Sequence, residues 1–167
     1  HACIGIEVAG KHILVDPFIT GNPKASHINI NELKADYILI THAHFDHIQD
    51  VEAIAKRTDA VIVSNWEIAN YYGAKELKFH PMNHGGSWTF DFGKVKYVAA
   101  VHSSAFPDGT YGGNPGGFVI EGEHKNIYIA GDTALTFDMQ LIPLRTNLDL
   151  AILPIGSNFT MDVEDAI

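Results

Sequence analysis

Short apolar runs separated by turn residues recur along the chain and predict its strands. These runs are rich in β-branched and aromatic residues, which favour strands; they cover 4–8, 12–15, 60–64, 77–80, 87–92, 94–101, 117–122, 126–130 and 148–153. The first two flank Ala9-Gly10-Lys11, a hairpin signal, and 117–122 with 126–130 predict a second hairpin. Residues 20–35 contain Gly21-Asn22-Pro23 and predict a loop.

One further run, Asp36 to Thr41, shows no alternation of apolar and polar residues and predicts a strand buried on both faces. The apolar residues at 48, 51, 54 and 55 follow it with helical spacing and predict a helix over 48–57. Further helices are predicted over 66–72 and 135–141, and one begins near 162. Strands in blocks with helices between them indicate an α/β or α+β class with a mixed sheet.

The segment between that buried strand and its helix carries the strongest chemical signal. His42-Ala43-His44-Phe45-Asp46-His47 places three imidazoles and one carboxylate in a predicted strand-to-helix loop. Such side chains suit zinc and similar divalent ions. The carboxyl end of a buried strand is also where open α/β sheets place their sites. A His-rich polar turn is the alternative, but the rest of the chain favours a metal site.

Two more candidate ligands follow apolar strands. His102 comes directly after the run 97–101, and Asp132 comes after 127–131. Taken alone, His102 fits a partnered core or loop histidine, and Asp132 fits a turn carboxylate. Their shared placement with the motif favours metal ligation, because six candidate ligands suffice for two ions that share a bridging carboxylate. The six are His42, His44, Asp46, His47, His102 and Asp132.

The loop after His102 is long for a connection. Residues 103–117 contain five Gly and two Pro in 15 residues. Beside a candidate ligand, such a loop predicts a pocket wall, with a plain flexible connection as the alternative. The exit loop Gly156-Ser157-Asn158 is placed to line the same edge.

Charge narrows the classes of partner. The formal net charge is −9, from 20 acidic and 11 basic residues, which disfavours nucleic acid and anionic membrane surfaces. No apolar run approaches the length of a membrane span. The lone Cys3 cannot form an internal disulfide and is expected to be a small core residue. We therefore expect a cytoplasmic protein with a small-molecule substrate; the oligomeric state cannot be read from the sequence.

These residues resemble the metallo-β-lactamase fold superfamily, in which the H-x-H-x-D-H motif, the later His102 and the Gly131-Asp132-Thr133 turn occur in this order. Finer features resemble the small metal-dependent hydrolases related to ascorbate-6-phosphate lactonase. They are Val15-Asp16-Pro17-Phe18, Asn83 with Gly85-Gly86-Ser87, Val101-His102-Ser103-Ser104, Tyr111-Gly112-Gly113 and Phe159-Thr160-Met161.

The resemblance implies a four-layer αβ/βα sandwich with the site at one rim. It implies that His42, His44 and His102 hold one ion, that Asp46 and His47 belong to a second, and that Asp132 bridges. It also implies a metal-bound hydroxide as nucleophile, with Asp46 orienting it or moving a proton as the catalytic residue. Zinc suits these ligands, with manganese or iron as alternatives.

The resemblance also sets expectations for residues around the ligands. Asp16 is expected either to hydrogen-bond a ligand histidine or simply to end a strand. His1 is expected near the pocket. The family has one more ligand histidine after Ile167, so we expect a single domain over 1–167 that lacks an N-terminal strand and a C-terminal portion. The remaining histidines are expected at surface or loop positions: His12, His27, His80, His84 and His124.

Three functions are therefore in view. The first is a metal-dependent hydrolase acting on a small ester, lactone or phosphoester. The second is a phosphodiesterase or nuclease of the same superfamily, which the acidic charge disfavours. The third is a metal-binding or regulatory module without turnover.

Overall fold

The computed structural model describes residues 3–167 and builds them around two five-stranded sheets. The first sheet has the order β1-β2-β3-β4-β5. Its strands are β1 (Ile4–Val8), β2 (Lys11–Val15), β3 (Tyr37–Leu39), β4 (Val61–Asn65) and β5 (Phe79–Met82). The second has the order β10-β9-β8-β7-β6. Its strands are β6 (Ser87–Phe90), β7 (Gly93–Ala99), β8 (Gly116–Glu121), β9 (Asn126–Ile129) and β10 (Leu150–Ile152).

Both sheets are mixed, as the sequence predicts. β1 and β2 form the predicted antiparallel hairpin, closed by Ala9 and Gly10, which both have positive φ. Strands β2 to β5 then run parallel to one another. In the second sheet β6 to β9 are antiparallel, and β10 joins β9 in parallel.

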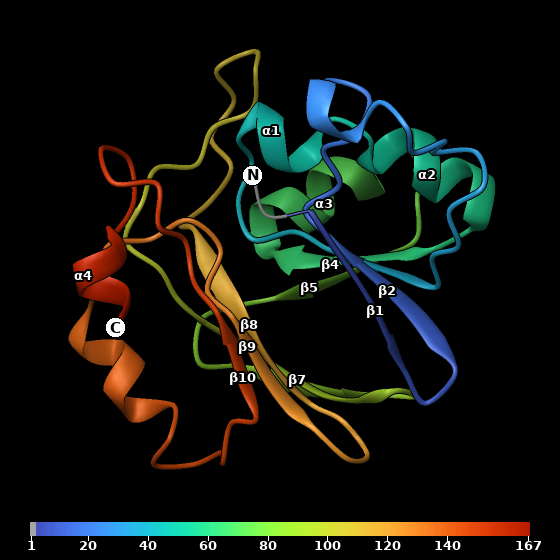
Figure 1. Cartoon of the computed structure of the whole chain (residues 1–167). Coiled ribbons are helices and arrows are strands. Elements are labelled where there is room, and N and C mark those ends of the chain that lie inside the picture. The colour runs from blue at the N-terminus through green and yellow to red at the C-terminus, as the bar shows by residue number, and fades with distance from the viewer. Residues whose placement is uncertain (1–2) are drawn as a thin grey trace.

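The two sheets face each other across one hydrophobic core (Figure 1). The first sheet contributes Ile13, Val15, Leu39 and Val63, and the second contributes Val95, Tyr97, Phe118, Ile120 and Ile129. All of these side chains are buried. Burial of this area is the main source of stability for such a sandwich.

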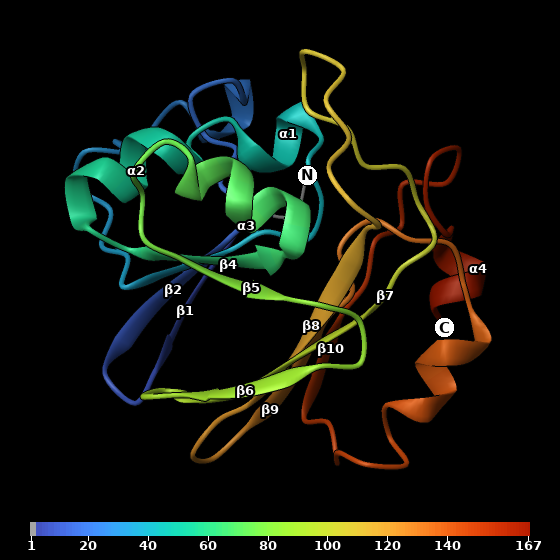
Figure 2. The ribbon, with the colours of Figure 1, turned by 180° about the vertical axis from the view of Figure 1, so that it is seen from behind.

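Helices cover the outer faces, as Figure 1 and its reverse view in Figure 2 show. The outer face of the first sheet carries α1 (Phe45–Ile48), α2 (Val51–Thr58) and α3 (Trp66–Gly73), which pack on Ile38, Ile40 and Ile62. The 3-10 turn η1 (Pro23–Ala25) lies within the predicted loop. The far side of the second sheet carries η2 (Phe137–Leu141) and α4 (Val163–Ala166). The four-layer αβ/βα sandwich is therefore confirmed.

The helix predicted over 48–57 is wrong in one respect, because two helices occupy this region. α1 begins at Phe45, so Phe45, Asp46 and His47 lie in a helical turn rather than in a loop. The break falls at Asp50, whose carboxylate accepts hydrogen bonds from the backbone of Ile19 at 2.6 Å and Thr20 at 3.0 Å. These bonds hold Asp50, which lies between α1 and α2, against the chain after β2. A separate helix, α2, therefore begins at Val51.

Other boundaries differ for local reasons. The strand predicted over 77–80 begins only at Phe79, because the Leu77 N–H closes the end of α3 on the Tyr72 carbonyl. The helix predicted over 135–141 is the 3-10 segment η2. Its side chains Phe137 and Leu141 are 86% and 58% exposed, so too little of their apolar surface is buried to stabilise a regular α-helix.

Two expectations from composition bear on the described chain. None of its helices is both long and apolar enough to cross a membrane. Cys3 is half-buried and packs against the cluster between the first sheet and its helices, as expected for a small core residue.

A glycine substitution tests the packing of the second sheet. In β8, a Cβ on Gly117 would lie 2.5 Å from the Ile129 carbonyl oxygen, so the neighbouring strand would have to move. We expect Gly117→Ala to lower the free energy of unfolding by about 1–3 kcal/mol, as overpacking does. Urea unfolding measures this change.

Gly5→Ala in β1 is the matched control. A Cβ there meets nothing within 4 Å. The substitution should leave stability unchanged or raise it by about 0.5–1 kcal/mol, because alanine loses less chain entropy on folding. Equal losses for the two variants would contradict this account of the sheet.

Candidate metal centre

The predicted ligands meet at one rim of the sandwich. The motif follows β3, His102 follows β7 and Asp132 follows β9. His42 and His47 are fully buried, whereas His44, Asp46, His102 and Asp132 are partly exposed. Three strands from two different sheets therefore deliver the six residues to one place.

Four imidazoles stand close together there. The ring centre of His42 lies 4.6 Å from that of His44, 4.0 Å from that of His47 and 5.0 Å from that of His102. One nitrogen each of His42, His44 and His102 lies within 4.8 Å of the others. This is the trio that the resemblance assigns to one ion.

The carboxylates lie beside these rings. Asp132 Oδ2 is 3.5 Å from His47 Nε2 and 3.8 Å from His102 Nε2. Asp46 Oδ2 is 3.8 Å from His47 Nε2. Asp132 thus stands between the two predicted ligand groups, where a bridging carboxylate has to be. Which of the six bind metal stays a prediction.

Asp16 decides how two of these rings are oriented. Its buried carboxylate contacts His47 Nδ1 at 2.8 Å and accepts hydrogen bonds from the Thr41 N–H at 2.8 Å and the Thr41 hydroxyl at 2.6 Å. Because the hydroxyl donates to Asp16, its oxygen is left to accept from His42 Nδ1 at 3.0 Å. Both rings then keep a proton on Nδ1. An ion would bind Nε2 of the neutral His42 ring directly and would replace the second proton of His47 at its Nε2.

Asp16, His42 and His47 also form a close donor group. Since both carboxylate oxygens of Asp16 already accept hydrogen bonds, we assign Asp16 to positioning rather than to metal binding. Of the two alternatives left open for this residue, the structure therefore selects hydrogen bonding to a ligand histidine.

Burial and neighbouring charges shift the pKa values of these histidines in opposite directions. Burial, together with nearby His47, lowers the pKa of His42 to about 2, so its ring is neutral. Burial also lowers the pKa of His44. For His47, burial disfavours the charged form, but Asp16 and Asp132 outweigh it and raise the pKa to about 10. Hydrogen bonding and charge from His47 likewise outweigh burial at Asp132 and lower its pKa to about 2.

The donor atoms fit a divalent ion. His47 Nε2 is buried and has no hydrogen bond of normal geometry; its neighbours are Asp132 Oδ2 at 3.5 Å and Asp46 Oδ2 at 3.8 Å. His42 Nε2 and His44 Nδ1 lie only 3.1 Å apart. Two nitrogens on one tetrahedral zinc, each at about 2.0–2.1 Å, would be separated by about 3.3 Å. An ion would give His47 Nε2 a partner and would replace the contact between His42 Nε2 and His44 Nδ1.

Several residues of the site were missed by sequence reasoning. Ser104 Oγ accepts a hydrogen bond from the Ala43 N–H at 3.1 Å and donates to the Gly112 carbonyl at 3.0 Å. Ser103 Oγ lies 3.2 Å from His44 Nε2. In the sequence, both serines count only as part of a run that resembles a known family. Their residue type alone does not indicate which groups they contact.

The loop over 103–117 is packed rather than loose. The Asn65 amide donates to the Gly112 carbonyl at 2.8 Å and to the Asn114 carbonyl at 3.1 Å. Phe106 is buried and its ring stacks on Tyr71. The alternative of a plain flexible connection is therefore wrong, because the loop is bound to α3 and to the motif.

A cavity of about 560 Å³ opens beside Asp46 and Asp132. Loop 103–117 does not line it, so the pocket-wall prediction is wrong for this cavity. The exit loop after β10 does contribute, through Gly156. The rest of the wall is mainly apolar: Cys3, Ile4, Ile129, Gly131, Ile152, Leu153, Pro154, Ile155, Phe159 and Thr160.

Most of the histidines that were not predicted as ligands lie away from the metal centre. His124 is exposed in the turn before β9, and His80 packs on Trp88 and Phe90. His84 is half-buried, with Nε2 at 2.9 Å from the Pro115 carbonyl oxygen and its ring against Tyr97. His1 lies outside the described residues.

Comparisons with known proteins agree with this geometry. The profile of the "Beta-lactamase superfamily domain" matches residues 11–167. A UPF0173 metal-dependent hydrolase of Flavobacterium johnsoniae is 80% identical over 167 residues, which cover all of this chain and 74% of that protein. One from Christiangramia forsetii is 69% identical and covers 98% of this chain and 73% of its own length.

A solved structure extends the likeness to three dimensions. Igni18, a metallo hydrolase from Ignicoccus hospitalis, superimposes with a TM-score of 0.87 at 36% identity, over 99% of this chain and 72% of that one. Sequence, fold and relatives agree, and the chain belongs to the beta-lactamase superfamily, within the family of UPF0173 metal-dependent hydrolases.

Proposed function

We propose that this protein hydrolyses a small neutral ester or lactone at the rim where the six predicted ligands meet. One observation carries the proposal. The imidazole and carboxylate cluster stands at the edge of a cavity of about 560 Å³, and among residues 3–167 its wall contains Asp46 and Asp132 but no lysine or arginine. A cavity of this size fits a small organic molecule.

The residues divide into two groups around the ions. His42, His44 and His102 would hold one ion, and Asp46 with His47 would contribute to a second, with Asp132 between them. Imidazole and carboxylate donors suit zinc, with manganese and iron as alternatives. A bound divalent ion would lower the pKa of water and polarise the attacked carbonyl.

Asp46 is the candidate proton carrier. Its carboxylate lines the cavity and is one-third exposed, so a substrate can reach it, while Asp16 is fully buried and engaged in hydrogen bonds. Asp46 would orient the attacking water and move its proton to the leaving group. The carboxylate of Asp16 would act only by holding His47 and, through Thr41, His42.

The charge of the wall selects among substrates. Phosphate groups are recognised by arginine and lysine side chains, and in the described part of the chain neither type lines this cavity. With a net charge of −9 the chain also repels polyanions. Both features favour a neutral ester or lactone over a phosphoester or a polynucleotide.

Removing two predicted ligands tests the function. His42→Ala combined with His44→Ala should abolish zinc binding at the first site, and hydrolysis of a lactone and phosphodiester panel should fall at least about 10²-fold, since the water would no longer be activated. Metal analysis and steady-state kinetics measure the two effects, and circular dichroism checks the fold.

His124→Ala, at an exposed turn, is the control and should keep full activity and metal content. Wild-type metal content after His42, His44 and His102 are all replaced would overturn the site. Metal binding without turnover of any panel member would indicate the regulatory module. A preference for the phosphodiesters would contradict the ester or lactone assignment.

A pH titration tests the arrangement around His47. In metal-free protein, nuclear magnetic resonance should find the His47 ring still protonated at pH 8 and the His42 ring neutral at pH 5, since their pKa values are about 10 and about 2. The raised pKa stabilises the metal-free fold below the ordinary value of 6.5, and that stabilisation fades as the pH rises towards 10. A His47 ring that loses its proton near pH 6.5 would contradict the role of Asp16 and Asp132.

Zinc affinity tests Asp16 as a positioning residue. Asp16→Asn should weaken zinc binding by about 10- to 100-fold, as loss of a hydrogen-bond partner of a ligand histidine does. Competition with a chromogenic chelator measures the affinity. Asp59→Asn, at an exposed residue that pairs with Lys78, is the matched control and should leave it unchanged. Unaltered affinity in Asp16→Asn would show that the ligands hold their orientation without it.

A further inference from the structure

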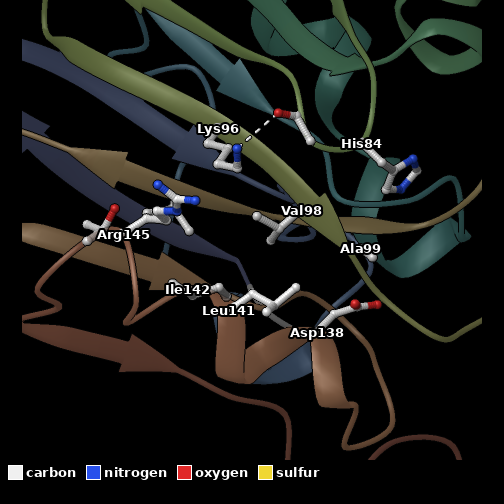
Figure 3. A pocket seen from close by; sticks show the side chains of 11 residues that line it. His84, Lys96, Val98, Ala99, Asp138, Leu141, Ile142 and Arg145 are labelled. Carbon is white, nitrogen blue, oxygen red and sulfur yellow. Dashed lines mark hydrogen bonds between the residues drawn. The ribbon is translucent and has the colours of Figure 1, made fainter.

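A second pocket lies on the outer face of the second sheet, away from the predicted ligands. Its volume is about 320 Å³, and none of the six candidate ligands lines it. The walls come from β7, β8, the His84-Gly85 turn and the segment from η2 to Thr146. Figure 3 shows the side chains that surround it.

The middle of the pocket is apolar. Val98 and Val119 point away from the core between the sheets, and they meet Leu141 and Ile142 across the pocket. Side chains alternate along β7, so Lys96 shares this outer face with Val98 while Tyr97 faces inward. The pocket thus offers an apolar floor with a cation on the same strand.

Opposite charges mark the two ends in Figure 3. Lys96 and Arg145 lie towards one end, and His84 and Asp138 towards the other. Lys96 Nζ donates to the Gly85 carbonyl at 3.0 Å. Within residues 3–167, the Arg145 guanidinium and the Asp138 carboxylate have neither a hydrogen bond nor an ion pair. Arg145 is exposed, so its guanidinium can be reached by a ligand from solvent.

We propose that this pocket binds a small apolar molecule with a single carboxylate, such as a medium-chain fatty acid. The carboxylate would lie at the Lys96 and Arg145 end, where the planar guanidinium can bind both oxygens. The hydrocarbon chain would cover Val98 and Ile142. Asp138 repels a carboxylate from the opposite end, so the ligand has one orientation.

Size and charge support a free small molecule. A volume of about 320 Å³ falls at the lower end of small-molecule sites. The net charge of −9 opposes attachment to an anionic membrane, although two basic residues stand at the rim. This site is independent of the proposed hydrolysis, since none of its residues belongs to the predicted metal centre.

Octanoate is the probe, with 1-octanol as the neutral analogue of equal chain length. Calorimetry and amide chemical shifts are recorded on the zinc-loaded 167-residue chain. We expect saturable octanoate binding, weaker binding of octanol, and shifts centred on Val98, Val119 and Ile142. Shifts confined to His42, His44 and His47 would place the carboxylate at the metal centre and overturn the proposal.

Charge variants separate this site from general hydrophobic binding. Arg145→Gln and Lys96→Gln should each weaken octanoate binding by about fivefold, the upper range for an exposed ion pair, and leave octanol binding unchanged. Lys24→Gln, at an exposed position in η1, is the matched control. Equal affinity for octanoate and octanol, or equal effects of all three variants, would overturn the proposal. The proposal would also be overturned if the protein sedimented with phosphatidylglycerol vesicles but did not bind octanoate.

Discussion

The buried carboxylate of Asp16 holds the rim of the sandwich together. A charge in an apolar interior is costly unless hydrogen bonds replace its water. Here the Thr41 N–H, the Thr41 hydroxyl and His47 Nδ1 replace it. These bonds join the end of β2 to the end of β3 and to α1. Asp16 adopts a positive φ of 46°, which turns the chain out of β2 at this point.

Thr41 links this part of the first sheet to the second sheet. Its carbonyl oxygen accepts hydrogen bonds from the Tyr97 hydroxyl at 2.9 Å and from the Gly116 N–H at 3.0 Å. The residue before Asp132 completes the contact, because a Cβ on Gly131 would lie 2.7 Å from the Thr41 Cβ. One threonine therefore sets the distance between the motif on the first sheet and the ligands on the second.

The same packing explains why two cavities differ. The cavity beside Asp46 lies where both sheets contribute, through Ile4 on one side and Ile129 and Ile152 on the other, and the segment after β10, from Leu153 to Thr160, completes its wall. The pocket on the outer face uses outward positions of β7, where alternation places Lys96 beside Val98. Strand alternation therefore places a cation in the lining of the outer pocket, whereas residues that follow the strands give the other cavity its carboxylates.

The sequence by itself determined most of the strands, the mixed-sheet class and the six candidate ligands, since apolar runs and His/Asp chemistry are local patterns; the resemblance implied the four-layer architecture. It placed His102 and Asp132 at the ends of strands, and the resemblance supplied their grouping. Only the tertiary structure decided that Asp16 orients His42 and His47, that Asp50 interrupts the helix after the motif, and that Ser104 and Asn65 fix the long loop. Except for the contact between Thr41 and His42, these roles depend on hydrogen bonds between residues more than 20 positions apart, and no local pattern of residue types encodes such partners.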